Sequence, residues 1–124
     1  MRVLITGASS GIGRDMARIL AKLNYNLILV ARNEDGLTKI KNELETENNK
    51  INITIYPMDL NIKENCYKLY ENEKNIDVLI NNAGFGLFGE FAETDLEKEI
   101  TMINTNITAV QILRWKAWER VLLP

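Results

Sequence analysis

A glycine-rich segment, Thr-Gly-Ala-Ser-Ser-Gly-Ile-Gly, occupies residues 6–13, between a short apolar run and a helical pattern. Such a turn directs backbone N–H groups and the positive end of a helix dipole at an anion. It therefore predicts a pyrophosphate site, and the alternative is a glycine-rich turn that binds nothing. The cofactor-binding residues expected in this segment are Thr6, Gly7, Ser9, Ser10, Gly11, Ile12 and Gly13.

Each glycine of this segment has an expected purpose. Gly7 would allow the turn out of the strand, and Gly11 would let a phosphate approach the backbone closely. Gly13 would let the helix pack tightly on the strand.

A second polar segment, Asn-Asn-Ala-Gly at residues 81–84, follows another apolar run. In doubly wound sheets, ligands bind at the carboxyl ends of the strands that flank the point where strand order reverses. Asn82, Ala83 and Gly84 are therefore expected at the same crevice. Asp59, with Leu60 after it, ends a third run, and its carboxylate could accept a hydrogen bond from an adenine amino group. The alternative for Asp59 is a helix N-cap.

Short apolar runs alternate with amphipathic segments along the whole chain. Strands are expected at 3–6, 27–31, 51–58 and 76–80, with a helix after each. The last helix is predicted to start at the capping box of residues 94–97. Helical spacing places the buried face of the first helix on Ile12, Met16, Ile19, Leu20 and Leu23, and that of the third on Ile62, Cys66, Leu69 and Tyr70. This order predicts an α/β fold with a parallel sheet.

Together these residues resemble the short-chain dehydrogenase/reductase family. The resemblance covers residues 1 to about 113. It implies a Rossmann-like doubly wound sheet, truncated to about four strands in the order 3-2-1-4, and an NAD(P)-binding half-domain over 1–113. Residues 102–107 resemble the segment that carries the family's active-site asparagine, which makes Asn106 the catalytic candidate. Asn104 and Asn106 would point about 200° apart on a helix, so only one of them can face the cofactor.

The end of the second strand bears on the choice of cofactor. An acidic residue there would bind the adenosine ribose 2′-hydroxyl, but the strand ends in Ala31 and Arg32. The planar cation of Arg32 suits a 2′-phosphate, and Arg14 could assist it. NADP(H) is therefore favoured over NAD(H). The alternative for Arg32 is a solvated loop residue.

The composition is that of a small globular domain. A formal net charge of −2 with no basic block argues against nucleic acid as the main partner. No apolar stretch is long enough to span a membrane, and no secretory leader is expected. The single cysteine, Cys66, fits a reducing cytoplasm and is expected to be a buried structural thiol. No metal site is expected.

Family members transfer a hydride between a nicotinamide and a small carbonyl or alcohol substrate, using a serine and a Tyr-x-x-x-Lys pair after the asparagine helix. Residues 107–124 contain neither tyrosine nor serine. The chain as printed is thus expected to hold NADP(H) without efficient turnover. Residues 114–124 are expected to be an atypical tail, either a continuation of the last helix or the scar of a truncation. Two alternatives stay open. One is a non-enzymatic dinucleotide-binding module; the other is an interaction fragment that pairs with a full-length relative or itself through the open edge of the sheet.

Overall fold

The computed structural model describes residues 1–84, 95–109 and 112–114. The chain divides into two compact units. The first comprises Met1–Asp59 and Glu73–Ala83, and the second comprises Leu60–Asn72 and the segment from Gly84 onward. Residues 85–94 and nearly all of the predicted tail at 114–124 lie outside the described residues.

The first unit contains a parallel sheet of four strands, β1 (Arg2–Thr6), β2 (Asn26–Ala31), β3 (Ile53–Pro57) and β4 (Val78–Ile80). Their order is β3-β2-β1-β4, which confirms the predicted topology. Val3 lies opposite both Leu27 and Val78 in the register. β1 and β2 each have a neighbouring strand on both sides, and their central residues, Val3–Ile5 and Leu27–Val30, are apolar and buried, as the central strands of a parallel sheet require.

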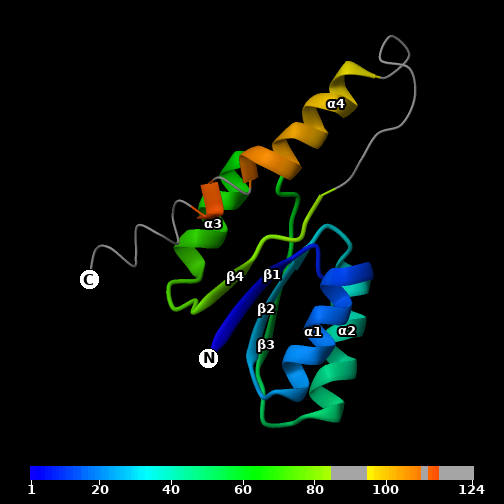
Figure 1. The fold of residues 1–124 in the computed structure, drawn as a ribbon, viewed down its shortest axis with the longest axis vertical. Helices are drawn as coiled ribbons and strands as arrows, with labels where there is room; N and C mark the ends of the chain where they lie inside the picture. The colour runs from blue at the N-terminus through cyan, green and yellow to red at the C-terminus, as the bar shows by residue number, and fades with distance from the viewer. Residues whose placement is uncertain (85–94, 110–111, 115–124) are drawn as a thin grey trace. The chain divides into compact units, whose positions relative to one another are not determined.

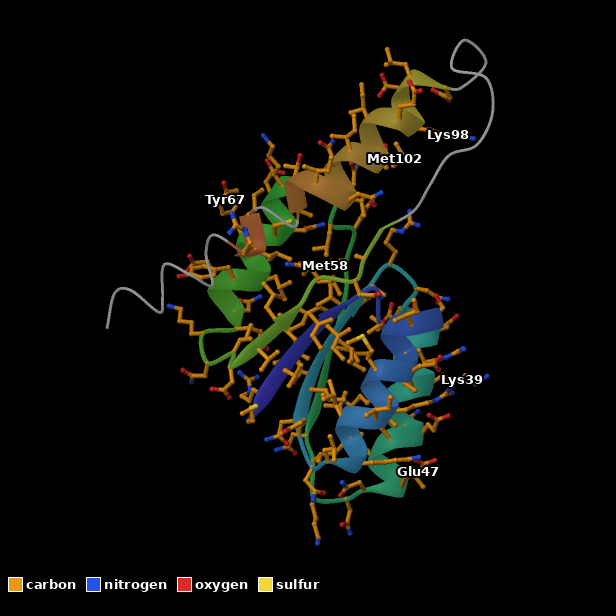
Figure 2. The ribbon with its side chains drawn as sticks, viewed as in Figure 1. Lys39, Glu47, Met58, Tyr67, Lys98 and Met102 are labelled. Carbon is orange, nitrogen blue, oxygen red and sulfur yellow. The ribbon has the colours of Figure 1, made fainter. Side chains whose placement is uncertain are left out.

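Two helices of the first unit, α1 (Gly11–Lys22) and α2 (Glu34–Glu47), lie side by side along the sheet (Figure 1). On the outer side of α2, Lys39 and Glu47 point away from the sheet (Figure 2). On its inner side, α2 buries Leu37, Ile40 and Leu44, as its spacing predicts. Asn33 caps α2 as expected, because its Oδ1 accepts the N–H of Gly36 at 3.0 Å.

The predicted core face of α1 is wrong for three of its five residues. Ile12, Ile19 and Leu23 are 71%, 61% and 58% exposed, whereas Gly13, Ala17 and Ala21 are buried. The helix approaches the sheet through its smallest residues, with Met16 and Leu20 partly buried at the border. The spacing of large apolar residues predicts that these face the sheet, but a helix that packs closely on a sheet places small residues at the contact.

One buried carboxylate ties the first unit together. Glu73 is 6% exposed and accepts hydrogen bonds from the Tyr56 hydroxyl at 2.6 Å and from Arg2 Nη2 at 2.7 Å. Burial and the bond to Glu73 raise the pKa of Tyr56 to about 12. Since Arg2 begins β1 and Tyr56 lies near the end of β3, the cluster links two strands that are not neighbours in the sheet.

The second unit contains the helix α3 (Lys63–Asn72), the helix α4 (Leu96–Ile103) and the π-helical turn η2 (Asn104–Thr108). Cys66 and Leu69 are buried as predicted, but Ile62 precedes α3 and is exposed. Asp95 caps α4 by accepting the N–H of Glu97 at 2.9 Å, so the cap lies one residue later than the predicted capping box.

Within the described ranges 1–84, 95–109 and 112–114, no helix has the length and apolar character needed to cross a membrane.

The outer side of β4 is an edge of the sheet in the first unit. In this part of the chain β4 pairs with β1 alone, and Val78 is 39% exposed. The predicted sheet edge is therefore present.

Candidate functional site

The glycine segment forms the turn that joins β1 to α1. Gly7 and Gly11 have φ angles of +69° and +57°, a conformation that other residues rarely adopt. A Cβ on Gly13 would collide with the carbonyl oxygen of Gly7, so tight packing of the helix on the turn is confirmed. A Cβ on Gly11, by contrast, would meet no atom within 4 Å. The turn is closed toward the protein at Gly13 and open toward a ligand at Gly11.

Thr6 holds this turn to the segment after β4. Its buried Oγ1 accepts the backbone N–H groups of Asn82 at 2.9 Å and Ala83 at 3.0 Å, and it donates to the Ile80 carbonyl oxygen at 3.5 Å. Asn82 Nδ2 in turn donates to the Gly7 carbonyl oxygen at 3.1 Å. The two predicted motifs are thus bonded directly to each other. The Thr6 hydroxyl and the Asn82 amide position the turn, because both are already engaged within the protein.

The turn is also fastened to β2. The N–H groups of Gly7 and Ala8 both donate to the Val30 carbonyl oxygen, at 2.8 and 3.2 Å. Since these bonds come from two strands and from the Asn82 segment, the turn is fixed in place before any ligand arrives.

The N-terminus of α1 is suited to an anion. Ser10 occupies the N-cap position but makes no side-chain cap hydrogen bond, and the first turn contains no acidic residue. By contrast, α2 and α4 have side-chain caps, and their first turns contain Glu34 and Asp35 in α2 and Glu97 and Glu99 in α4. The first N–H groups of α1 therefore keep their positive partial charge, and the exposed Ile12 lies beside them. These residues fit a dinucleotide pyrophosphate.

The corner after β2 lies against the glycine turn. A Cβ on Gly36 would be 3.1 Å from Ser9 Cβ, so the first turn of α2 touches the turn after β1. Sequence reasoning missed Gly36, although a glycine in the first turn of a helix is itself an unusual signal. The exposed Arg32 follows β2 directly, at the carboxyl edge of the sheet. Asp59, half-buried, follows β3 at the same edge of the sheet.

An ion pair between charged side chains links α1 to α2 further along the two helices. Arg18 donates to both carboxylate oxygens of Glu43, at 2.9 and 3.1 Å. This hydrogen bonding holds the pKa of Glu43 below its ordinary value, against the opposing effect of desolvation, and the charge of Arg14 contributes further. Arg14 Nε is buried and has no hydrogen-bond partner within the described part of the chain. Its guanidinium therefore retains unused donor capacity near the start of α1.

In the second unit, the structure brings Gly84 and Asn106 together. A Cβ on Gly84 would lie 2.7 Å from Asn106 Oδ1. Asn106 lies in the middle of η2, where the Ala109 N–H donates to the Asn104 carbonyl oxygen. The α-helical geometry expected for Asn104 and Asn106 is therefore wrong, because both residues lie in a π-helical turn. Within that turn Asn104 is half-buried and Asn106 is exposed. Turns of this kind are frequent at functional sites.

Leu60 and Cys66 also contact each other in the second unit. Cys66 Sγ donates to the Leu60 carbonyl oxygen at 3.7 Å, and burial raises the pKa of this thiol to about 11. Cys66 is thus a buried, protonated structural residue, as predicted.

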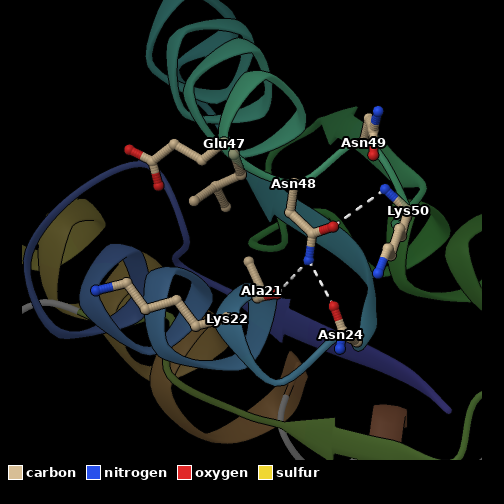
Figure 3. A pocket seen from close by; sticks show the side chains of 8 residues that line it. Ala21, Lys22, Asn24, Glu47, Asn48, Asn49 and Lys50 are labelled. Atoms are coloured by element: carbon tan, nitrogen blue, oxygen red, sulfur yellow. Dashed lines mark hydrogen bonds between the residues drawn. The ribbon is translucent and has the colours of Figure 1, made fainter.

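A hollow of about 410 Å³ lies at the opposite end of α1 and α2, far along both helices from the glycine turn (Figure 3). Asn48 Nδ2 donates there to the Ala21 carbonyl oxygen at 3.0 Å and to Asn24 Oδ1 at 2.7 Å. Asn48 Oδ1 accepts the Lys50 N–H at 3.0 Å. Asn24 follows α1, has a φ of +66° and donates its backbone N–H to the Ala21 carbonyl oxygen at 3.0 Å. These amides satisfy one another, so the hollow is a helix-end junction.

Comparison with known proteins places this geometry in a family. The sequence model of the protein family described as "short chain dehydrogenase" matches residues 1–121 of this chain. The chain belongs to the short-chain dehydrogenase family. The strand order β3-β2-β1-β4 matches that of the family's solved structures.

Among its relatives, the chain is 37% identical over 122 residues to the 3-oxoacyl-[acyl-carrier-protein] reductase of Rickettsia prowazekii, covering 96% of this chain and 47% of that one. It is 40% identical over 111 residues to the very-long-chain 3-oxoacyl-CoA reductase of Kluyveromyces lactis, covering 82% and 32%. A solved short-chain dehydrogenase from Sphingobium yanoikuyae, in complex with NADPH, matches with a TM-score of 0.92 and 31% identity, covering 98% and 48%. The chain thus spans about a third to a half of the length of these short-chain dehydrogenases.

Proposed function

We propose that this chain is the NADP(H)-binding portion of an oxidoreductase that transfers a hydride between the nicotinamide and a small carbonyl or alcohol substrate. The observation that carries the proposal is the N-terminus of α1. It has no side-chain cap and no acidic residue in its first turn, and a Cβ on Gly11 would meet no atom within 4 Å. When bound, the cofactor supplies the hydride. The chain's own residues bind and orient it, over residues 1–113.

Each predicted residue has a distinct part in this proposal. The backbone from Ser9 to Gly13 would hold the pyrophosphate, while Thr6 and Asn82 keep that backbone in place. Asp59, with Leu60 beside it, would contact the adenine, and Ala83 and Gly84 would border the cofactor. Asn106 would be the active-site residue.

The preference for NADP(H) rests on two cations. Arg32 is exposed at the corner where Ser9 meets α2, and Arg14 has a buried Nε without a partner in the described residues. Both favour a 2′-phosphate over a ribose hydroxyl pair. The Sphingobium relative and the L-sorbose reductase from Gluconobacter frateurii, whose structures contain NADPH, support the same class of cofactor.

Titration of the purified chain with NADPH and NADH, followed by cofactor fluorescence and by calorimetry, tests the proposal. NADPH should bind about tenfold or more tightly than NADH, because the 2′-phosphate adds charge-assisted hydrogen bonds. Equal affinities would contradict the preference, and no binding of either would contradict the function. No tyrosine follows Asn106 in residues 1–124, so this chain alone should bind NADPH without reducing a carbonyl.

A second candidate function is self-association or pairing with a full-length relative. It is favoured by the open edge of β4 and by exposed apolar side chains on α4 and η2, namely Leu96, Ile100, Ile103 and Ile107. Light scattering decides it, since a monodisperse monomer at all concentrations would contradict association. A cytoplasmic location is part of the main proposal, and cell fractionation tests it.

A further inference from the structure

We propose that Gly84 is a positioning residue for Asn106. This inference rests on the proposed function for its meaning, because Asn106 is the active-site candidate. The contact itself is independent of that function.

The evidence begins with what surrounds Gly84. The three atoms nearest to a Cβ built on this residue are Asn106 Oδ1 at 2.7 Å, Cγ at 3.3 Å and Nδ2 at 3.9 Å. All three belong to one side chain, and Gly84 is otherwise exposed. Its φ lies outside the left-handed region that demands glycine, in contrast to Gly7 and Gly11. The missing side chain at position 84 is therefore explained by space for Asn106 and not by backbone strain.

The second step concerns the backbone around Asn106. Residues 104–108 form the wide turn η2, closed by the Ala109 N–H on the Asn104 carbonyl oxygen. Thr108 Oγ1 also donates to Asn104 Oδ1 at 3.5 Å across this turn. A π-turn shifts the direction of the side chains within it relative to a regular α-helix. The turn η2 fixes the backbone of Asn106, and the absence of a side chain at Gly84 leaves space for the side-chain amide of Asn106.

A methyl group at position 84 would meet the end of a flexible side chain, not backbone. Asn106 can rotate away from such a group at small cost, so Gly84→Ala should fold with nearly unchanged stability. The change should instead displace the Asn106 amide. This outcome separates positioning from a purely structural role, which would alter stability and leave the orientation of Asn106 unchanged.

A double-mutant cycle on the 124-residue chain tests the inference, using Gly84→Ala, Asn106→Ala and the double variant. The first readout is the side-chain NH₂ signal of Asn106 in ¹⁵N–¹H spectra without cofactor, assigned by its loss in Asn106→Ala. Gly84→Ala should shift this signal. The second readout is NADPH affinity, which Gly84→Ala should lower about tenfold in the native background and less than about twofold beside Asn106→Ala.

Gly36→Ala is the matched control, because none of the three atoms nearest to its added Cβ belongs to Asn106. Its effect should be the same in both backgrounds. An unmoved Asn106 signal in Gly84→Ala, or a measurable loss of NADPH affinity that is equal in both backgrounds, would overturn the inference. If Gly84→Ala fails to fold, folding of the double variant supports it and failure of both overturns it. A shifted signal in a chain that never binds NADPH would instead refute the proposed function alone.

Discussion

Thr6 Oγ1 accepts the backbone N–H of Asn82 at 2.9 Å, which joins the end of β1 to the segment that follows β4. The two residues are 76 positions apart in the chain, and the same hydroxyl also accepts the Ala83 N–H. One buried side chain therefore joins the glycine turn to the Asn81–Gly84 segment.

Replacing Thr6 by valine keeps its shape and removes this acceptor. Two buried N–H groups would lose their partner, so Thr6→Val should lower the free energy of unfolding by about 2 kcal/mol. It should also weaken NADPH binding, since the glycine turn is no longer held. Urea unfolding and cofactor titration measure both effects. Thr6→Ser retains the hydroxyl and is the control; if serine proves as damaging as valine, the hydroxyl is not the cause.

The carboxylate cluster predicts a change of stability at high pH. The pKa of Tyr56 is about 12 in the fold against about 10 in the unfolded chain, so the neutral phenol favours the fold. Its contribution is complete below pH 10 and disappears as the pH rises from 10 to 12. Tyr56→Phe should cost about 1–2 kcal/mol at pH 8, where the hydrogen bond to Glu73 is lost.

The gap in unfolding free energy between Tyr56→Phe and the native chain should close as the pH rises from 10 to 12. Urea midpoints at intervals of pH give this gap directly. Tyr25→Phe serves as the control because Tyr25 has no part in the cluster. A gap that stays constant to pH 12 would show that Tyr56 does not titrate as described.

Cys66 should be unreactive in the folded chain. Burial raises its pKa to about 11, so almost no thiolate forms at neutral pH. A thiol reagent at pH 7.5 should label the native protein far more slowly than the protein in 6 M guanidinium. Because Cys66 is the single cysteine, absorbance of the released chromophore reports on it alone. Equal rates in both conditions would mean that α3 opens readily.

Arg32 should distinguish the two cofactors. Arg32→Ala is expected to weaken NADPH binding about tenfold or more and to leave NADH binding nearly unchanged, because only NADPH carries the 2′-phosphate. Lys39→Ala removes another exposed cation from the first unit and should affect neither cofactor. A loss of NADPH affinity that is equal in both variants would indicate general electrostatic attraction.

Sequence patterns predicted the sheet because its signals are local. The apolar runs that become β1 and β2 are buried on both faces, and right-handed crossovers then limit the strand order. The core face of α1 was not predictable in the same way. Its burial of Gly13, Ala17 and Ala21 depends on how closely the helix approaches the sheet, which no periodicity of large apolar residues records.

The candidate site was predictable as a list of residues but not as a set of contacts. The bonds from Thr6 to Asn82 and from Tyr56 to Glu73 join residues that only the folded sheet brings together. The π-turn at Asn106 has no local sequence signal, and Gly84 was recognised as part of a motif without its contact to Asn106. Long-range polar contacts of this kind follow from tertiary structure.

The uncapped N-terminus of α1 has a consequence for how the site responds to its surroundings. Its donors are peptide groups, which neither gain nor lose protons in the physiological range. Affinity for the pyrophosphate should therefore stay level between pH 6 and 9, where carboxylates remain charged and arginines cannot deprotonate. Competing salt, by contrast, should weaken the contribution of the exposed Arg32. Binding of the pyrophosphate would then be insensitive to pH, whereas the preference between the two cofactors should narrow as the salt concentration increases.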